Sequence, residues 1–172
     1  YLHIVTEEHP LKKEMKQVWC TVSGDHIIYP GKVSTPTADL TTVKWLLNSV
    51  ISTPGAHFMT ADIKDFYLNN PLDRYEYMWI YLKDIPDAII QQYNLLSLVH
   101  KNHVLVEICK GMYGLPKAGI IANTHLVQHL ATHGYQACTH TPGLFCHATH
   151  PVTFALVVDD FGIKYEGQDH AD

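Results

Sequence analysis

Alternating apolar and polar residues mark the predicted β-strands of this chain. A strand with one buried face repeats with a period of two, and a short run of apolar residues indicates a strand buried on both faces. By these patterns we expect strands at residues 57–63, 77–82, 103–108, 144–147 and 152–158. We interpret the first as a buried strand with Asp62 at its carboxyl end, on the face opposite Met59 and Ala61.

Apolar residues at helical spacing predict three helices. The first follows Thr37 or Asp39, either of which can cap it, and ends before Pro54. A short second helix begins at Pro86, because proline is favoured in the first turn of a helix. The third follows a loop with three glycines, residues 110–119, and runs to about residue 133.

The N-terminal residues predict a charged lead-in followed by a flap. Residues 1–17 are polar and carry Lys12, Lys13 and Lys16, so we expect an extended or partly ordered segment with a solvated face. Residues 18–29 alternate around Ser23-Gly24-Asp25, which is typical of a β-hairpin, and Pro30-Gly31 then interrupts the chain.

The order of these elements favours an α+β fold. We expect helices to cover one face of a mainly antiparallel sheet and to leave the other face open. The strand at 152–158 and a returning strand that ends at about Tyr165 would form a hairpin with Asp159 and Asp160 at its tip, and Asp62 would share the open face with them.

Composition and charge exclude some classes of protein function. The 172 residues are 47% hydrophobic, enough for one domain with a core. The formal net charge is -5 and Arg74 is the single arginine, which disfavours general nucleic-acid binding through a basic surface.

No apolar run reaches the length of a membrane span and no signal peptide is recognised, so we expect an intracellular protein. Because the chain begins at Tyr1 without methionine, we expect an excised segment of a longer protein.

The four cysteines do not have the spacing of a disulfide framework, so we expect reduced thiols. One group of residues combines types that ligate zinc: Cys138, His140, Cys146, His147 and His150. A His/Cys zinc-binding interaction module is therefore one alternative, although the spacing matches no standard zinc finger.

The acidic residues suggest a different chemistry. Asp159 and Asp160 in a turn are by themselves typical of a solvated surface. If Asp62 lies on a neighbouring strand, however, three carboxylates converge, and hard cations such as Mg2+ are needed to offset their repulsion. Two such ions can activate a hydroxyl nucleophile and stabilise a departing pyrophosphate, which is the chemistry of nucleotidyl transfer.

Three short motifs occur in order along the chain. They are residues 62–68 (Asp-Ile-Lys-Asp-Phe-Tyr-Leu), 113–119 (Tyr-Gly-Leu-Pro-Lys-Ala-Gly) and 157–160 (Val-Val-Asp-Asp). Together they resemble the polymerase motifs of the reverse transcriptases of LTR retrotransposons, especially of the copia-type Pol polyprotein. The resemblance covers nearly the whole chain and places the motifs on the expected strand, loop and hairpin.

This resemblance implies a right-hand polymerase fold, with one partial reverse transcriptase domain over residues 1–172. Residues 1–56 and 72–110 would be fingers-like, residues 57–71 and 111–172 palm-like, and the thumb and RNase H domain would not be present. The implied activity is RNA-directed DNA polymerase, which transfers dNTPs onto a primer 3′-hydroxyl along an RNA or DNA template with two Mg2+, or Mn2+ in their place. The implied partners are the thumb, RNase H and integrase of a Pol polyprotein, and the implied location is a cytoplasmic virus-like particle with access to the nucleus.

The resemblance also assigns roles to residues. Asp62, Asp159 and Asp160 would be catalytic and metal-binding, and the backbone carbonyl of Ile63 would complete a metal shell. The residues near the nucleotide would be Ile63, Asp65, Phe66, Tyr67 and Lys117. The residues near the template or primer would be Gly114, Pro116 and Gly119. The alternative for Tyr67 is a core aromatic residue, and the alternative for Lys117 is a solvated side chain.

Some residues depart from the family pattern. Val157 stands where tyrosine is usual, Lys117 where glutamine is common, and residues 18–22 lack the cation that the fingers usually offer to a triphosphate. A missing cation weakens both the positioning of the triphosphate and its electrostatic stabilisation. These departures leave open a catalytically inactive, decayed retrotransposon fragment that retains the fold, and we expect the isolated chain to be inactive.

Overall fold

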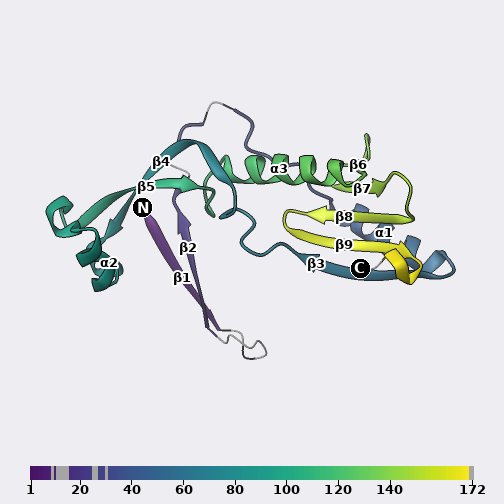
Figure 1. The fold of residues 1–172 in the computed structure, drawn as a ribbon, viewed down its shortest axis with the longest axis horizontal. Helices are drawn as coiled ribbons and strands as arrows, with labels where there is room; N and C mark the ends of the chain where they lie inside the picture. Colours follow the sequence, from purple (N-terminus) through teal and green to yellow (C-terminus); the bar gives the residue numbers. More distant parts are fainter. Residues whose placement is uncertain (9, 11–15, 25–26, 30, 171–172) are drawn as a thin grey trace. The chain divides into compact units, whose positions relative to one another are not determined.

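The computed structural model describes residues 1–8, 10, 16–24, 27–29 and 31–170. The chain forms two compact units (Figure 1). The first unit comprises Tyr1–Val33 and Tyr67–Ile121, and the second comprises Ser34–Phe66 and Ala122–Asp172. All the paired strands are antiparallel and several helices accompany them, so the predicted α+β class is confirmed.

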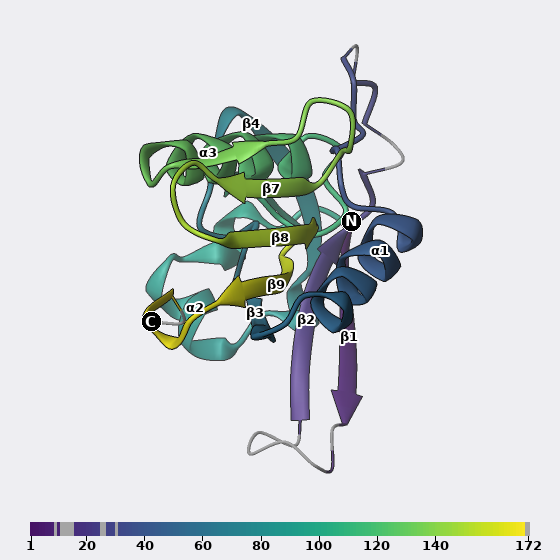
Figure 2. The same cartoon turned by 90° about the vertical axis from the view of Figure 1, so that its right-hand side faces the viewer.

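A five-stranded sheet organises the second unit. Its strands follow one another in the order β3-β9-β8-β7-β6, and Figure 2 shows β7, β8, β9 and β3 in this sequence. The strands are β3 (Ala56–Asp62), β6 (Tyr135–Ala137), β7 (Leu144–His147), β8 (Val152–Val157) and β9 (Asp160–Glu166). The sequence predicted each of them except the short β6.

Helices cover both faces of this sheet, whereas the sequence predicted one covered face. Leu46 of α1 (Leu40–Ser52) packs in one core cluster with Leu144, and Val127 of α3 (Ala118–Thr132) packs against Phe145 in another. Because neighbouring residues of a strand point to opposite faces, α1 and α3 lie on opposite sides. Residues 154–156 are accordingly buried in succession. The apolar run in β8 is thus explained by a strand whose two faces are both buried under helices.

Helix α1 begins where the sequence predicted. Asp39 is its N-cap, and its side chain accepts a hydrogen bond from the Thr42 backbone N–H at 2.7 Å. At the other end of the helix, Lys164 of β9 donates to the hydroxyls of Ser49 and Thr53 at 2.8 and 2.7 Å. The helix is therefore fixed to the sheet at both ends, since the backbone N–H of Ala38 also donates to Leu156 at 2.8 Å.

Strand β3 is an edge strand, and the prediction that it is buried is wrong. It pairs with β9 on one side, and Phe58 remains 39% exposed. The apolar residues of this segment did not reveal its edge position, because pairing depends on residues far away in the sequence.

In the first unit, β1 (Leu2–Glu8) and β2 (Lys16–Val22) form an antiparallel pair. The prediction of a hairpin within residues 18–29 is wrong, because residues 27–29 form no strand and the partner of β2 is β1, in the segment that we expected to be a polar lead-in. The β-branched residues Ile4, Val5 and Thr6 explain the strand. Lys12, Lys13, Asp25 and Pro30, which belong to these predictions, lie outside the described residues.

A second antiparallel pair completes the first unit. It consists of β4 (Pro71–Tyr81) and β5 (His103–Lys110), with α2 (Asp87–Gln92) and the 3-10 turns η2 (Leu82–Asp84) and η3 (Leu95–Leu98) between them. Leu72 and Ile108 of this pair pack with Val22, Met112 and Leu115 in the core of the unit. A further 3-10 turn, η4 (Gln168–His170), follows β9 in the second unit.

Among the described residues, no helix combines the length and the apolar character needed to cross a membrane.

Candidate active site

The three predicted catalytic aspartates lie at one end of the five-stranded sheet. Asp62 ends β3 and is the cross-strand partner of Asp160, the first residue of β9. Asp159 precedes Asp160 in the β8–β9 turn, and its carbonyl accepts a hydrogen bond from the Ile63 backbone N–H at 3.1 Å. This bond extends the β3–β9 pairing beyond Asp62, so the backbone holds the carboxylate-bearing segments side by side.

The turn itself differs from the prediction by one residue. Val157 pairs with Asp160, which leaves Val158 and Asp159 as the two turn residues and makes Asp160 part of β9. Val158 has a φ of 61°, in the left-handed region that β-branched residues rarely adopt. A two-residue hairpin turn needs such a φ at its first position, where glycine is the usual residue.

The environment makes Asp159 harder to ionise. Burial raises the pKa of its carboxyl above the ordinary value of 3.8, the charges of Asp160 and Asp62 raise it further, and a backbone hydrogen bond opposes them in part. The negative charges of the three residues therefore act on one another, and a bound cation would relieve their repulsion.

The aspartates fit Mg2+ in donor type, because this ion prefers carboxylate oxygens. In the described part of the chain, however, no three His, Cys, Asp or Glu side chains are grouped closely enough to hold a metal ion. The backbone thus brings the three aspartates together, while their side chains do not form a finished coordination shell. The residues at 138–150 form no such group either, so the zinc module has no site in this structure.

A family model described as reverse transcriptase (RNA-dependent DNA polymerase) matches residues 12–170. The chain belongs to this reverse transcriptase family. The match supports a reverse-transcriptase-like function in general, with nucleic acid and dNTPs as partners. Searches of curated proteins and of solved structures returned no match.

Two predicted nucleotide-binding residues of this reverse transcriptase follow Asp62 in the second unit. Asp65 is exposed and has a φ of 56°, a conformation that aspartate tolerates better than most residues. Phe66 is 4% exposed and is part of the core. A nucleotide could therefore meet Phe66 through its backbone, as predicted, but not through its ring.

Tyr67 belongs to the first unit of the reverse transcriptase. Its ring packs edge-on against Tyr113, with 4.7 Å between the ring centroids, and it lies against the core cluster around Met112. This packing agrees with the alternative of a core aromatic residue, and a contact with the sugar stays a prediction.

Lys117 is paired, whereas the alternative to phosphate binding was a solvated side chain. Its ammonium forms a salt bridge and hydrogen bond with Asp73 and lies 5.4 Å from the centroid of the Tyr29 ring. The hydrogen bond to Asp73 is the main cause that raises the pKa of Lys117, followed by a hydrogen bond to Tyr29. Sequence analysis missed the pair, because two residues 44 positions apart give no periodic signal.

Gly114 of the predicted template loop is required for the packing of the loop against Val22. Gly114 has a φ of 93°, and a Cβ atom there would lie 2.0 Å from the carbonyl oxygen of Val22. Next to it, the Val22 backbone N–H donates to Tyr113 at 2.9 Å. Pro116 lines a small cavity of about 160 Å³ beside Lys117, and Gly119 lies in the first turn of α3. Contacts of these residues with template or primer stay predictions.

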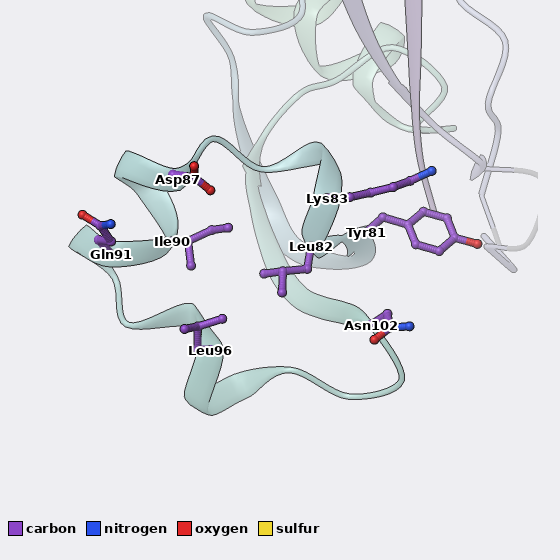
Figure 3. Close-up of a pocket in the computed structure, with 8 residues that line it drawn as sticks. All are labelled: Tyr81, Leu82, Lys83, Asp87, Ile90, Gln91, Leu96 and Asn102. Carbon is purple, nitrogen blue, oxygen red and sulfur yellow. The ribbon is translucent and has the colours of Figure 1, made fainter.

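A larger cavity, of about 690 Å³, lies in the first unit (Figure 3). Leu82, Ile90 and Leu96 point into the same space, while Tyr81 and Lys83 project side by side. The Lys83 ammonium lies 5.2 Å from the centroid of the Tyr81 ring. No predicted site residue lines this cavity, so its size alone does not identify the active site.

Proposed function

We propose that this reverse transcriptase domain is the catalytic core of a copia-type LTR retrotransposon enzyme. It would transfer dNTPs onto a primer 3′-hydroxyl along an RNA or DNA template. The observation that carries the proposal is the pairing of Asp62 with Asp160, with Asp159 next to them in the turn. Convergent carboxylates of this kind can bind the metal cations that assist nucleotidyl transfer.

In this proposal the aspartates hold two Mg2+ ions, with Mn2+ as a substitute. Bound there, the ions would activate the 3′-hydroxyl and stabilise the departing pyrophosphate. Asp62 and Asp159 would be the principal ligands, Asp160 the second carboxylate of the turn, and the carbonyl of Ile63 an additional donor. The raised pKa of Asp159 supports this assignment, because burial and, to a lesser degree, the charges of Asp160 and Asp62 disfavour its carboxylate, and a bound cation would offset both effects.

The wider assignment follows from the same lineage. Residues 57–71 and 111–172 would form the palm of a right-hand polymerase, and residues 1–56 and 72–110 the fingers. The thumb, RNase H and integrase of a Pol polyprotein would be its partners, in a cytoplasmic virus-like particle with access to the nucleus. The acidic net charge of -5 supports a division of labour in which such partners carry the basic contacts to nucleic acid.

A second candidate is a decayed copy that keeps the fold without turnover. It is favoured by Val157 in place of tyrosine and by β2, in which Lys16 is the single lysine or arginine and is 3.6 Å from Glu8. Without a cation for the triphosphate, both positioning and stabilisation are weakened.

Two measurements test these candidates. Mn2+ binding to the purified chain is measured by electron paramagnetic resonance. Primer extension on an RNA template with Mg2+ is measured with a longer chain that includes the thumb, because we expect the isolated chain to be inactive. We expect Asp62→Asn and Asp159→Asn to weaken Mn2+ binding, and the exposed Asp84→Asn to leave it unchanged as the matched control. Undiminished binding in both site variants would refute the metal assignment.

The extension assay separates the enzyme from the decayed copy. Extension that Asp159→Asn abolishes and Asp84→Asn preserves supports the enzyme, whereas extension that survives Asp159→Asn contradicts it. Mn2+ binding without extension supports the decayed copy.

A further inference from the structure

A cleft of about 450 Å³ lies in the second unit, and none of the predicted catalytic, nucleotide-binding or template-binding residues lines it. One wall is α3, with Asn123 and Val127, and the other is the β6–β7 connection, with Cys138 and Pro142. Phe145 borders the cleft, but its ring is 4% exposed and belongs to the core. Cavities of this size with mostly apolar walls and a few polar groups are typical of small-molecule sites.

The polar group that distinguishes this cleft is Asn123. It is 8% exposed, and among the described residues it is the one buried side chain with a polar or charged head. Its carboxamide makes no hydrogen bond with the described part of the chain. A polar group in such a position is ordinarily paired, so water or a ligand must supply the hydrogen bonds of this carboxamide.

The carboxamide faces the cleft. Within the described residues, His103 Nε2 is the one side-chain nitrogen or oxygen that is fully enclosed without a partner. The nitrogen and oxygen of Asn123 therefore keep an opening, and the cleft that Asn123 lines is the space they open onto.

The lining defines the chemistry of a ligand. Among the described residues that line the cleft, none has a charged side chain, which disfavours a phosphate or a carboxylate as the bound group. The Asn123 carboxamide presents a donor and an acceptor side by side, and asparagine pairs in this way with the N6 and N7 edge of adenine. Val127 and Pro142 offer apolar surface to a flat ring. We propose that this cleft binds a neutral nucleobase, adenine in type, through Asn123. The site is independent of the aspartates and of the function proposed for them.

The test uses adenosine as the probe and the purified chain as it is. Alkylation of Cys138, which lines the cleft, is followed by mass spectrometry, and the exposed Cys20 and Cys109 serve as internal controls. We expect adenosine at about ten times its Kd to slow alkylation of Cys138 about tenfold, because only about a tenth of the protein is then free of ligand. The other two cysteines should react at an unchanged rate. An unchanged rate at Cys138 would overturn the proposal.

A variant separates a ligand-binding role from a structural one. Asn123→Leu should abolish the protection by adenosine without lowering the melting temperature of the ligand-free protein, because the carboxamide makes no hydrogen bond with the described part of the chain. Asn48→Leu, the same change at an exposed position of α1, should alter neither. If Asn123→Leu keeps the protection, or if it fails to fold, then Asn123 is not the ligand contact and the proposal is wrong.

Discussion

Asp62 and Asp160 form the last residue pair of the β3–β9 ladder. Directly opposed residues in an antiparallel sheet have Cβ atoms about 5 Å apart, and like charges at that distance destabilise the pairing. Asp159 adds a third carboxyl next to them. The sheet therefore ends in a cluster of negative charge, at a place where apolar pairs would be more stable.

The first prediction concerns the pH dependence that Asp159 causes. Because its pKa is raised on folding, the folded protein takes up a proton at a higher pH than the unfolded chain does. Stability should therefore rise as the pH falls from the raised pKa towards the ordinary value of 3.8. Asp159→Asn should be more stable than the parent at pH 7, because the neutral amide avoids the cost of burying a charge and the repulsion by Asp160 and Asp62. The gain should be less than about 1 kcal/mol, because solvent screens these effects. Urea unfolding across this pH range measures both effects.

Asp39 provides a control of opposite sign. The hydrogen bonds from Thr42 lower the pKa of the Asp39 carboxyl, so its contribution is present above pH 3.8 and is lost as the pH falls through the lowered value. Asp39→Ala should therefore destabilise the protein at pH 7. If Asp159→Asn also destabilises the protein, then the charge of Asp159 is not unfavourable in the folded state and the first prediction is wrong.

The second prediction concerns strain in the β8–β9 turn. Val158 has a φ of 61°, which costs a β-branched residue about 1–3 kcal/mol. Val158→Gly should stabilise the protein by about 1 kcal/mol, after the entropy cost of glycine in the unfolded chain is subtracted. Val157→Gly, in the adjacent strand position, is the control and should be destabilising. Thermal unfolding of both variants measures these changes in stability. A loss of stability in Val158→Gly would show that Val158 is not strained.

Local patterns predicted the elements that surround this site. The helical spacing after Asp39 and the capping aspartate located α1 to within a few residues, and α3 was placed equally well. The apolar run before Asp159 correctly predicted a strand leading into a hairpin. In each case the signal lies within one element and its turn, where short-range sterics and capping decide the conformation.

Pairing across long distances could not be predicted in this way. β1 pairs with β2, α3 covers the sheet face opposite α1, and Lys117 binds Asp73. None of these choices leaves a periodic trace, because each depends on which distant residues meet after the chain has folded. The unpaired amide of Asn123 is of the same kind, since a polar residue within an amphipathic helix ordinarily faces solvent.

The third prediction compares two glycines of the second unit. Gly143 and Gly55 have φ values of 74° and 78°, so alanine is strained equally in the two. At Gly143 a Cβ would also lie 2.0 Å from the backbone nitrogen of Ala38, whereas at Gly55 no atom lies within 4 Å. Gly55→Ala should cost about 1 kcal/mol and Gly143→Ala more than about 2 kcal/mol, because backbone must move. Equal losses in chemical denaturation would show that the β6–β7 connection does not pack on Ala38.

The last prediction concerns the two partly buried thiols of the second unit. Cys138 and Cys146 have their sulfur atoms 3.7 Å apart, and burial followed by the contact with Cys146 raises the pKa of the Cys138 thiol. The Cys138 thiol is therefore protonated near neutral pH, and only a thiolate reacts readily. Hydrogen peroxide should take two electrons and two protons from the pair, giving one disulfide and two waters, and the reaction should accelerate as the pH rises towards 9.

Peptide mass spectrometry should find the Cys138–Cys146 link before any link to the exposed Cys20 or Cys109. Closing this short loop should stabilise the oxidised protein by about 2–3 kcal/mol. A mixture of all pairings would show that the two sulfur atoms are not neighbours in solution.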